Sequence, residues 1–287
     1  MPIAVIGHVT KDTVINSLGE KSQTGGTAYY TAIALARLGI KTHVYTKLAE
    51  GDRALLSPMH VKNIELFPSF CGHTTSFRNI YPKNDTDYRE QFVGSIAEPF
   101  EISDITNMKA NIVHLGPLTN SDIPLVVFKH LKSLGLAVSL DMQGFMRKIA
   151  GKKVSKAKWK DAKKFLRHVD ILKADANEVE LIAGKNGTRK IANMGPVEIV
   201  ITNGSRGSLV YSRKQKKLYK IPAFKPVTII DATGAGDTYI AGYLAKRIES
   251  NDIEECGRFA AMCATMKIEN GFFNAAKKDV EKRLKDS

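Results

Sequence analysis

Short apolar runs alternate with amphipathic segments along most of this 287-residue chain. Each run has four to eight residues rich in β-branched side chains, a pattern typical of strands buried on both faces. Helical patterns between them, at 25–39, 121–135 and 175–184, each end at a glycine. Strands separated by helices predict an α/β fold with a mostly parallel sheet flanked by helices on both faces. The predicted strands span 3–9, 42–48, 111–118, 136–142, 169–174, 197–202 and 227–232.

Two segments in the N-terminal part interrupt this alternation. Residues 74–92 contain two strand-like runs around the turn-forming sequence PKNDTD, which predicts a hairpin. Residues 12–17 have the pattern of a further short strand. We therefore expect a single α/β domain over 1–287, with a small β lid formed by insertions at about 12–24 and 72–95. A hairpin without function is the alternative.

Composition restricts the setting and the partners of the chain. No stretch approaches the 18 apolar residues of a membrane span, and the three cysteines form no CxxC pair. These features predict a cytoplasmic protein with no membrane partner. The net charge is +14, of which +9 lies in residues 147–167. We interpret this stretch as a solvated basic helix face and expect no nucleic-acid partner.

A glycine-rich corner, within IIDATGAGDTYIAGYLAK at 229–246, joins a predicted strand to a predicted helix. The N-terminus of a helix has unpaired N–H groups and the positive end of the dipole, so it suits an anion. Gly234 and Gly236 would let backbone amides approach a phosphate closely. The amides of Gly234, Ala235 and Gly236 could then stabilise a transferred phosphoryl group, while Asp237 accepts the proton of the attacking hydroxyl. A tight turn with a dipole-complementing aspartate is the alternative.

The sequence DATGAGDTYIAGYL closely resembles the C-terminal signature of the PfkB or ribokinase family of carbohydrate kinases. Residues 25–39 resemble the family's N-terminal glycine signature, and TNGSRGSLVY at 202–211 resembles its TxGxxG segment. The resemblance implies a ribokinase-like fold and an ATP-dependent phosphotransferase that acts on an alcohol group, with Mg²⁺ and with Asp237 as the base. It also implies nucleotide-binding positions at Thr202, Gly204, Gly207, Thr233, Gly234 and Gly236.

The segment KADANEVELIAG at 173–184 aligns with the family's NxxE motif. In this alignment Asp175 stands at the Asn position and Glu178 at the Glu position. Carboxylates suit Mg²⁺ and its water shell, so the resemblance implies that both support the metal indirectly, through water. A helix N-cap at Asp175 with Glu178 completing a capping box is the alternative, and both roles can hold together.

A narrower resemblance, to the myo-inositol kinase branch of the family, covers GHVTKD, TTSFRNIY, DYREQF and DMQGFMRK. Asp12 follows the first predicted strand, at the sheet edge where open α/β folds bind ligands. Ribokinase proper has an asparagine where Tyr30 stands, which disfavours ribose as the acceptor. The resemblance implies a small polyol or sugar, with myo-inositol as the first candidate. The implied substrate-binding residues are Asp12, Gly25, Gly26, Asn79, Arg89, Gln143 and Arg147.

Three questions stay open at this stage. Within the same fold, a nucleoside kinase or a ribokinase-type sugar kinase is an alternative. Outside it, a catalytically inactive sugar-binding regulator is another, although the intact GAGD sequence argues against it. A homodimer that pairs lid strands through the edge of 75–81 is a further expectation.

Overall fold

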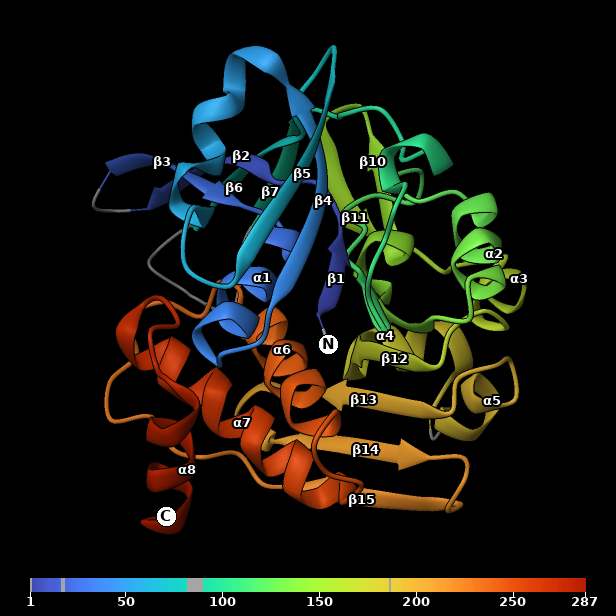
Figure 1. The fold of residues 1–287 in the computed structure, drawn as a ribbon, viewed down its shortest axis with the longest axis vertical. Helices are drawn as coiled ribbons and strands as arrows, with labels where there is room; N and C mark the ends of the chain where they lie inside the picture. The colour runs from blue at the N-terminus through green and yellow to red at the C-terminus, as the bar shows by residue number, and fades with distance from the viewer. Residues whose placement is uncertain (1, 17–18, 82–89, 186) are drawn as a thin grey trace.

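The computed structural model describes residues 2–16, 19–81, 90–185 and 187–287, and it contains two sheets (Figure 1). The larger sheet has nine strands, parallel from β5 to β13 and antiparallel only at β13, β14 and β15. This arrangement confirms the predicted mostly parallel sheet. In spatial order the strands are β15 (Lys217–Ile221), β14 (Ser208–Ser212), β13 (Glu198–Thr202), β12 (Ile171–Asp175), β9 (Ala137–Asp141), β8 (Ile112–Leu115), β1 (Ile3–Ile6), β4 (Thr42–Ala49) and β5 (Ile64–Cys71).

Helices cover both faces of this sheet (Figure 1). One layer consists of α1 (Thr27–Arg37), α6 (Ala235–Arg247), α7 (Ile253–Asn270) and α8 (Lys277–Lys285). The other consists of α2 (Leu125–Ser133), α3 (Ala162–Leu166), α4 (Ala176–Ala183) and α5 (Thr188–Ala192). Each layer buries its own apolar cluster against the sheet, which anchors the helices. Short 3₁₀ helices are η1 (Glu50–Met59), η3 (Ile102–Ile105), η4 (Met142–Met146) and η5 (Gly204–Arg206).

The helices also bear on the membrane prediction. Among the residues that the structure describes, no helix combines the length and the hydrophobicity needed to cross a bilayer.

The smaller sheet is the lid, and it is mostly antiparallel. Four of its strands lie in the two regions predicted to form it, and two come from the basic stretch. The prediction of a basic helix face is therefore wrong for 147–156, whereas 162–166 form the helix α3. Ile149 and Val154 alternate with lysines and pack against Phe77 and Val93, which favours a hairpin there. The strands in order are β10 (Arg147–Ala150), β11 (Lys153–Lys156), β7 (Glu90–Ser95), β6 (Ser76–Ile80), β2 (Thr10–Asn16) and β3 (Gly19–Gly25).

Two further predictions are corrected by the sheet topology. Residues 227–232 form no strand: Val227 and Ile230 are 84% and 67% exposed. The hairpin of β14 and β15 extends the sheet at this end, and the segment runs along α7 instead, with Ile230 N donating to Ile268 O at 3.0 Å. Strand β6 pairs with both β2 and β7, so the edge expected to form a dimer is already occupied.

The lid joins the main sheet around His8, just after β1. The buried His8 ring stacks on Phe100 with its Nδ1 3.2 Å from Thr75 Oγ1 and 3.5 Å from Asp122 Oδ2. The Asp122 carboxylate also accepts hydrogen bonds from the amides of Leu118 and Thr119. These contacts fix the stem of the lid at the carboxyl end of β1.

Candidate active site

The glycine-rich corner lies at the N-terminus of α6. Gly234 is the N-cap residue with φ 76°, and a Cβ there would lie 2.5 Å from the Tyr30 ring. Ala235 N–H already donates to Ala232 O at 3.1 Å. Within the described part of the chain, no acceptor takes the backbone N–H of Gly234, Gly236 or Asp237. The helix therefore presents open amides at this corner, as an anion site requires.

Asp237 lies in the first turn of α6, with a half-buried side chain. Burial, and next the charge of Asp141, raise its pKa to about 6. The ammonium of Lys173 opposes the increase, as do a hydrogen bond with Thr27 and, more weakly, the Arg147 guanidinium. A carboxylate that titrates near neutral pH is suited to accept a proton from a hydroxyl group.

A buried ion pair lies beside the corner. Lys173 Nζ in β12 is 2.8 Å from Asp141 Oδ2 at the end of β9, and both side chains are nearly inaccessible to solvent. The same Nζ lies 3.1 Å from the position that a Cβ at Gly236 would occupy. Burial opposes the charge of Lys173, but nearby carboxylates, Asp141 foremost, outweigh it and raise its pKa. The site thus holds a cation next to the open amides.

Sequence reasoning missed this ion pair. The signal for Lys173 was a lysine inside an apolar strand pattern at 169–174, where a buried charge requires a partner. Its partner is 32 residues away, so only the strand order of β9 and β12 brings the two together.

Asp175 and Glu178 form the capping box that sequence reasoning gave as the alternative. The Asp175 side chain accepts from Glu178 N, and Glu178 Oε2 accepts from Asp175 N, each at 2.7 Å. Lys156 from the lid also donates to Asp175 Oδ2 at 2.9 Å. Burial raises the pKa of Glu178 to about 7. The described residues hold no group of three or more His, Cys, Asp or Glu side chains arranged to bind a metal directly.

On the acceptor side, Asp12 is buried in β2 and lies against the start of α1. A Cβ at Gly25 would collide with the Asp12 carboxylate, and one at Gly26, where φ is 94°, would collide with the His8 carbonyl. Both glycines are therefore needed for close packing of this corner. Burial and the charges of Asp12, Asp231 and Asp237 raise the pKa of Tyr30, which places its ring among these carboxylates.

The other predicted acceptor residues form two pairs. Asn79 Oδ1, buried in β6, accepts from Gln91 Nε2 at 2.8 Å. Gln143 Oε1 accepts from Arg147 Nη2 at 2.9 Å, and the Arg147 guanidinium lies 5.5 Å from the centre of the Phe77 ring. Arg147 thus links η4 to the lid. The predicted residue Arg89 lies outside the described residues.

The predicted nucleotide-side positions have local structural roles. Thr202 Oγ1 donates to Ala174 O at 3.4 Å, and Thr233 N donates to Asp231 Oδ1 at 2.9 Å. Gly204 and Gly207 both have positive φ, and a Cβ at Gly207 would collide with the Ile221 carbonyl. Their roles in nucleotide binding stay predictions.

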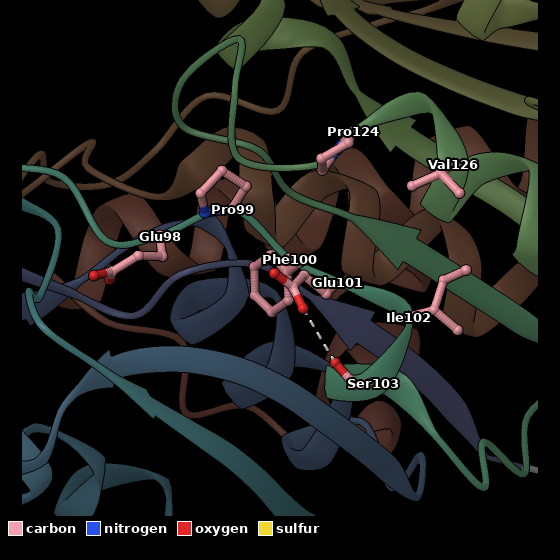
Figure 2. A pocket seen from close by; sticks show the side chains of 8 residues that line it. All are labelled: Glu98, Pro99, Phe100, Glu101, Ile102, Ser103, Pro124 and Val126. Atoms are coloured by element: carbon pink, nitrogen blue, oxygen red, sulfur yellow. Dashed lines mark hydrogen bonds between the residues drawn. The ribbon is translucent and has the colours of Figure 1, made fainter.

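A separate hollow lies beyond the stem of the lid, lined by residues 98–103 with Pro124 and Val126 (Figure 2). Figure 2 shows the Glu98 side chain apart from Phe100, and the Glu101 carboxylate in contact with Ser103. None of the predicted site residues is among the described residues that line this hollow.

Comparison with known proteins decides the family. The model of the pfkB family carbohydrate kinases matches residues 98–274, more than half of the chain. The chain belongs to this family. It is therefore a phosphotransferase that acts on an alcohol group and requires a phosphoryl donor.

Individual relatives differ in acceptor and donor. A cytidine kinase from Thermococcus kodakarensis is 28% identical over 90% of this chain and 92% of its own length. A pyrophosphate-dependent kinase in the ribokinase family, solved with a pyrophosphate analog and myo-inositol, is 28% identical with a TM-score of 0.86, over 98% of this chain and 99% of the other. Arabidopsis thaliana ribokinase, complexed with ribose and ATP, has a TM-score of 0.76 at 20% identity over 100% and 99% of the two chains. The ribokinase-like fold is thereby shown, while the acceptors named for these relatives are a nucleoside, myo-inositol and ribose.

Proposed function

We propose that the chain phosphorylates a hydroxyl group of a cyclic polyol of the myo-inositol type, with Asp237 as the general base. The observation that carries this proposal is the Asp237 carboxyl group in the first turn of α6, which begins with the open amides, while the Lys173 ammonium lies 3.1 Å from the Cβ position of Gly236. Burial raises the pKa of this carboxyl group to about 6. Asp237 removes the proton of the acceptor hydroxyl, and the oxygen attacks the transferred phosphorus. The bond from phosphorus to the leaving oxygen breaks, while the amides of Gly234 and Gly236 with Lys173 stabilise the charge.

The acceptor side supports a polyol. Asp12, the pair of Asn79 and Gln91, and the pair of Gln143 and Arg147 offer carboxylate, amide and guanidinium groups, which suit several hydroxyls on one ring. The similarity to a structure that contains myo-inositol supports the same class. A nucleoside is the second candidate, because the cytidine kinase is equally similar in sequence.

For the donor we propose pyrophosphate. A donor of two phosphates needs cations and amides rather than a pocket for a nucleobase. Lys173 provides a cation beside the glycine-rich corner, and Lys156 provides one at Asp175. The similar pyrophosphate-dependent kinase agrees with this choice. ATP, the donor expected from the sequence, is the second candidate. The exposed apolar side chains of Val227, Ile229 and Phe272 favour it, because a nucleobase could cover them.

Magnesium fits the turn before α4 as a hydrated ion. Within the residues that the structure describes, no group donates a hydrogen bond to Glu178 Oε1, so this oxygen can accept one from a metal-bound water. Asp175 and Glu178 would hold the ion through water, and the ion would supply charge neutralisation on the donor phosphates.

A matrix of donors and acceptors tests the proposal. Pyrophosphate and ATP, each with Mg²⁺, are combined with myo-inositol, ribose, fructose, adenosine and cytidine, and the phosphorylated product is measured by mass spectrometry. We expect the largest kcat/KM with pyrophosphate and myo-inositol. Product only from a nucleoside would refute the acceptor, and product only with ATP would refute the donor. A folded protein without any product would favour the non-catalytic alternative.

A further inference from the structure

The segment that leads into the glycine-rich corner runs outside both sheets, so its position depends on other contacts. Those contacts come from the last turn of α7. Ile230 N donates to Ile268 O at 3.0 Å, and Val227 N donates to Glu269 Oε1 at 2.7 Å. Arg283 of α8 in turn forms an ion pair with Glu269. The end of α7 therefore sets the path of the chain just before the open amides.

Lys267 in the same turn contacts Asp231, the residue at which the glycine-rich corner begins. Its side chain is 1% exposed, and Nζ donates to Asp231 O at 2.9 Å and to Asp231 Oδ2 at 3.2 Å. The other carboxylate oxygen, Oδ1, accepts from Thr233 N. The Lys267 ammonium is thus bound to both the main chain and the side chain of Asp231. The Asp231 side chain in turn holds Thr233, the residue before Gly234.

Tyr30 completes the arrangement behind the corner. Lys267 Nζ lies 6.0 Å from the centre of the Tyr30 ring, and the ring packs so closely on Gly234 that a side chain there has no room. An ammonium group loses favourable hydration when it is buried, and burial lowers the pKa of Lys267. A methionine would fill this space without that cost, so stability alone gives no reason for a lysine here.

We propose that Lys267 is a positioning residue for phosphoryl transfer: its ammonium is an internal cation that fixes the corner Asp231–Gly236 so that the open amides face the transferred group. This proposal rests on the proposed function for the reaction that it serves. Lys267 acts through Asp231 and not on the substrate itself. Its contribution should therefore be found in kcat and in anion binding rather than in the KM of the acceptor.

The test compares Lys267→Met and Lys267→Ala with the wild type and with Lys246→Met. Lys246 is a matched control, because it is also a largely buried lysine in an ion pair. It lies at the C-terminal end of α6, away from the glycine-rich corner, and pairs with Glu255 of α7. We expect Lys267→Met to retain its thermal unfolding transition and an acceptor KM within about threefold, while kcat falls by about 10². Lys267→Ala should recover kcat about tenfold in ammonium chloride, but not in tetramethylammonium chloride at equal ionic strength. Lys246→Met should retain normal turnover.

A binding measurement separates failure of this proposal from failure of the proposed function. Calorimetry with methylenediphosphonate, a non-transferable pyrophosphate analogue, should show an affinity about tenfold weaker in Lys267→Met than in Lys246→Met, whichever acceptor is used. Equal affinities in the two variants would overturn the positioning role. A folded Lys267→Met with kcat close to the wild type would also overturn the positioning role. So would a folded Lys267→Ala whose kcat ammonium does not restore. Absence of turnover in the wild type would refute only the proposed function.

Discussion

Replacement of Asp237 by asparagine should lower turnover and raise stability. The variant keeps the shape of the side chain but cannot accept a proton, so kcat should fall by about 10² or more, as is typical for loss of a general base. Binding of the donor should change little, because the amides of Gly234 and Gly236 stay in place. The gain in stability is expected because the wild-type carboxylate is ionised in a half-buried position.

The magnitude of the gain follows from the pKa. A rise from the usual 3.8 to about 6 corresponds to about 3 kcal/mol between the two protonation states. Because solvent reaches the half-buried carboxyl group, we expect about 1 to 2 kcal/mol. Between pH 3.8 and 6 the folded wild type binds more protons than the unfolded chain, so its free energy of unfolding falls as the pH rises. The advantage of Asp237→Asn should thus be full at pH 8, smaller at pH 5, and absent below pH 3.8.

The assay is urea unfolding of wild type and variant at pH 8 and pH 5, with initial rates measured on the same preparations. Asp237→Glu is the control, because it retains a carboxylate in a displaced position. A variant with asparagine that turns over at near-normal rates would remove Asp237 from the role of base. Equal stability of the wild type and the asparagine variant at pH 8 would show that the carboxylate is well solvated, and would contradict the electrostatic account of its pKa.

Three other predictions follow from the same site. Lys173→Met should lower kcat/KM for the donor by about 10² in initial-rate measurements, since it removes the cation beside the amides; an unchanged value would exclude contact with the phosphates. Gly234→Ala should lose about 2 kcal/mol or more in urea unfolding because it combines positive φ with a collision against Tyr30, whereas Gly204→Ala, with positive φ but open space, should lose less. The value of kcat/KM should rise about tenfold per pH unit up to about pH 6 as Asp237 ionises, and a flat profile from pH 5 to 8 would contradict that assignment.

The sequence predicted the geometry of the glycine-rich corner well because its signals are local. Glycines next to an aspartate at the start of a helical pattern determine an exposed helix N-terminus, and Gly234 and Asp237 lie there in the structure. The preceding apolar run was misassigned, since Val227 and Ile230 have the composition of a buried strand but are exposed. Composition does not reveal that two other strands extend the sheet at that end.

Residues that depend on distant partners could not be found from the sequence. Lys267 appears there as one lysine in an amphipathic helix, and its contact with Asp231 spans 36 residues. The basic stretch at 147–156 was misassigned for a related reason. Its alternation of lysines with Ile149 and Val154 favours a strand only when an apolar neighbour, here Phe77 of the lid, covers one face.

The most direct test of the central claim is a phosphorus NMR spectrum of the wild type incubated with pyrophosphate, Mg²⁺ and myo-inositol. If Asp237 directs phosphoryl transfer to a polyol hydroxyl, one phosphomonoester and one orthophosphate should form for each pyrophosphate consumed, and Asp237→Asn should form neither at a comparable rate. Orthophosphate without a phosphomonoester, or an unchanged pyrophosphate signal, would contradict the account.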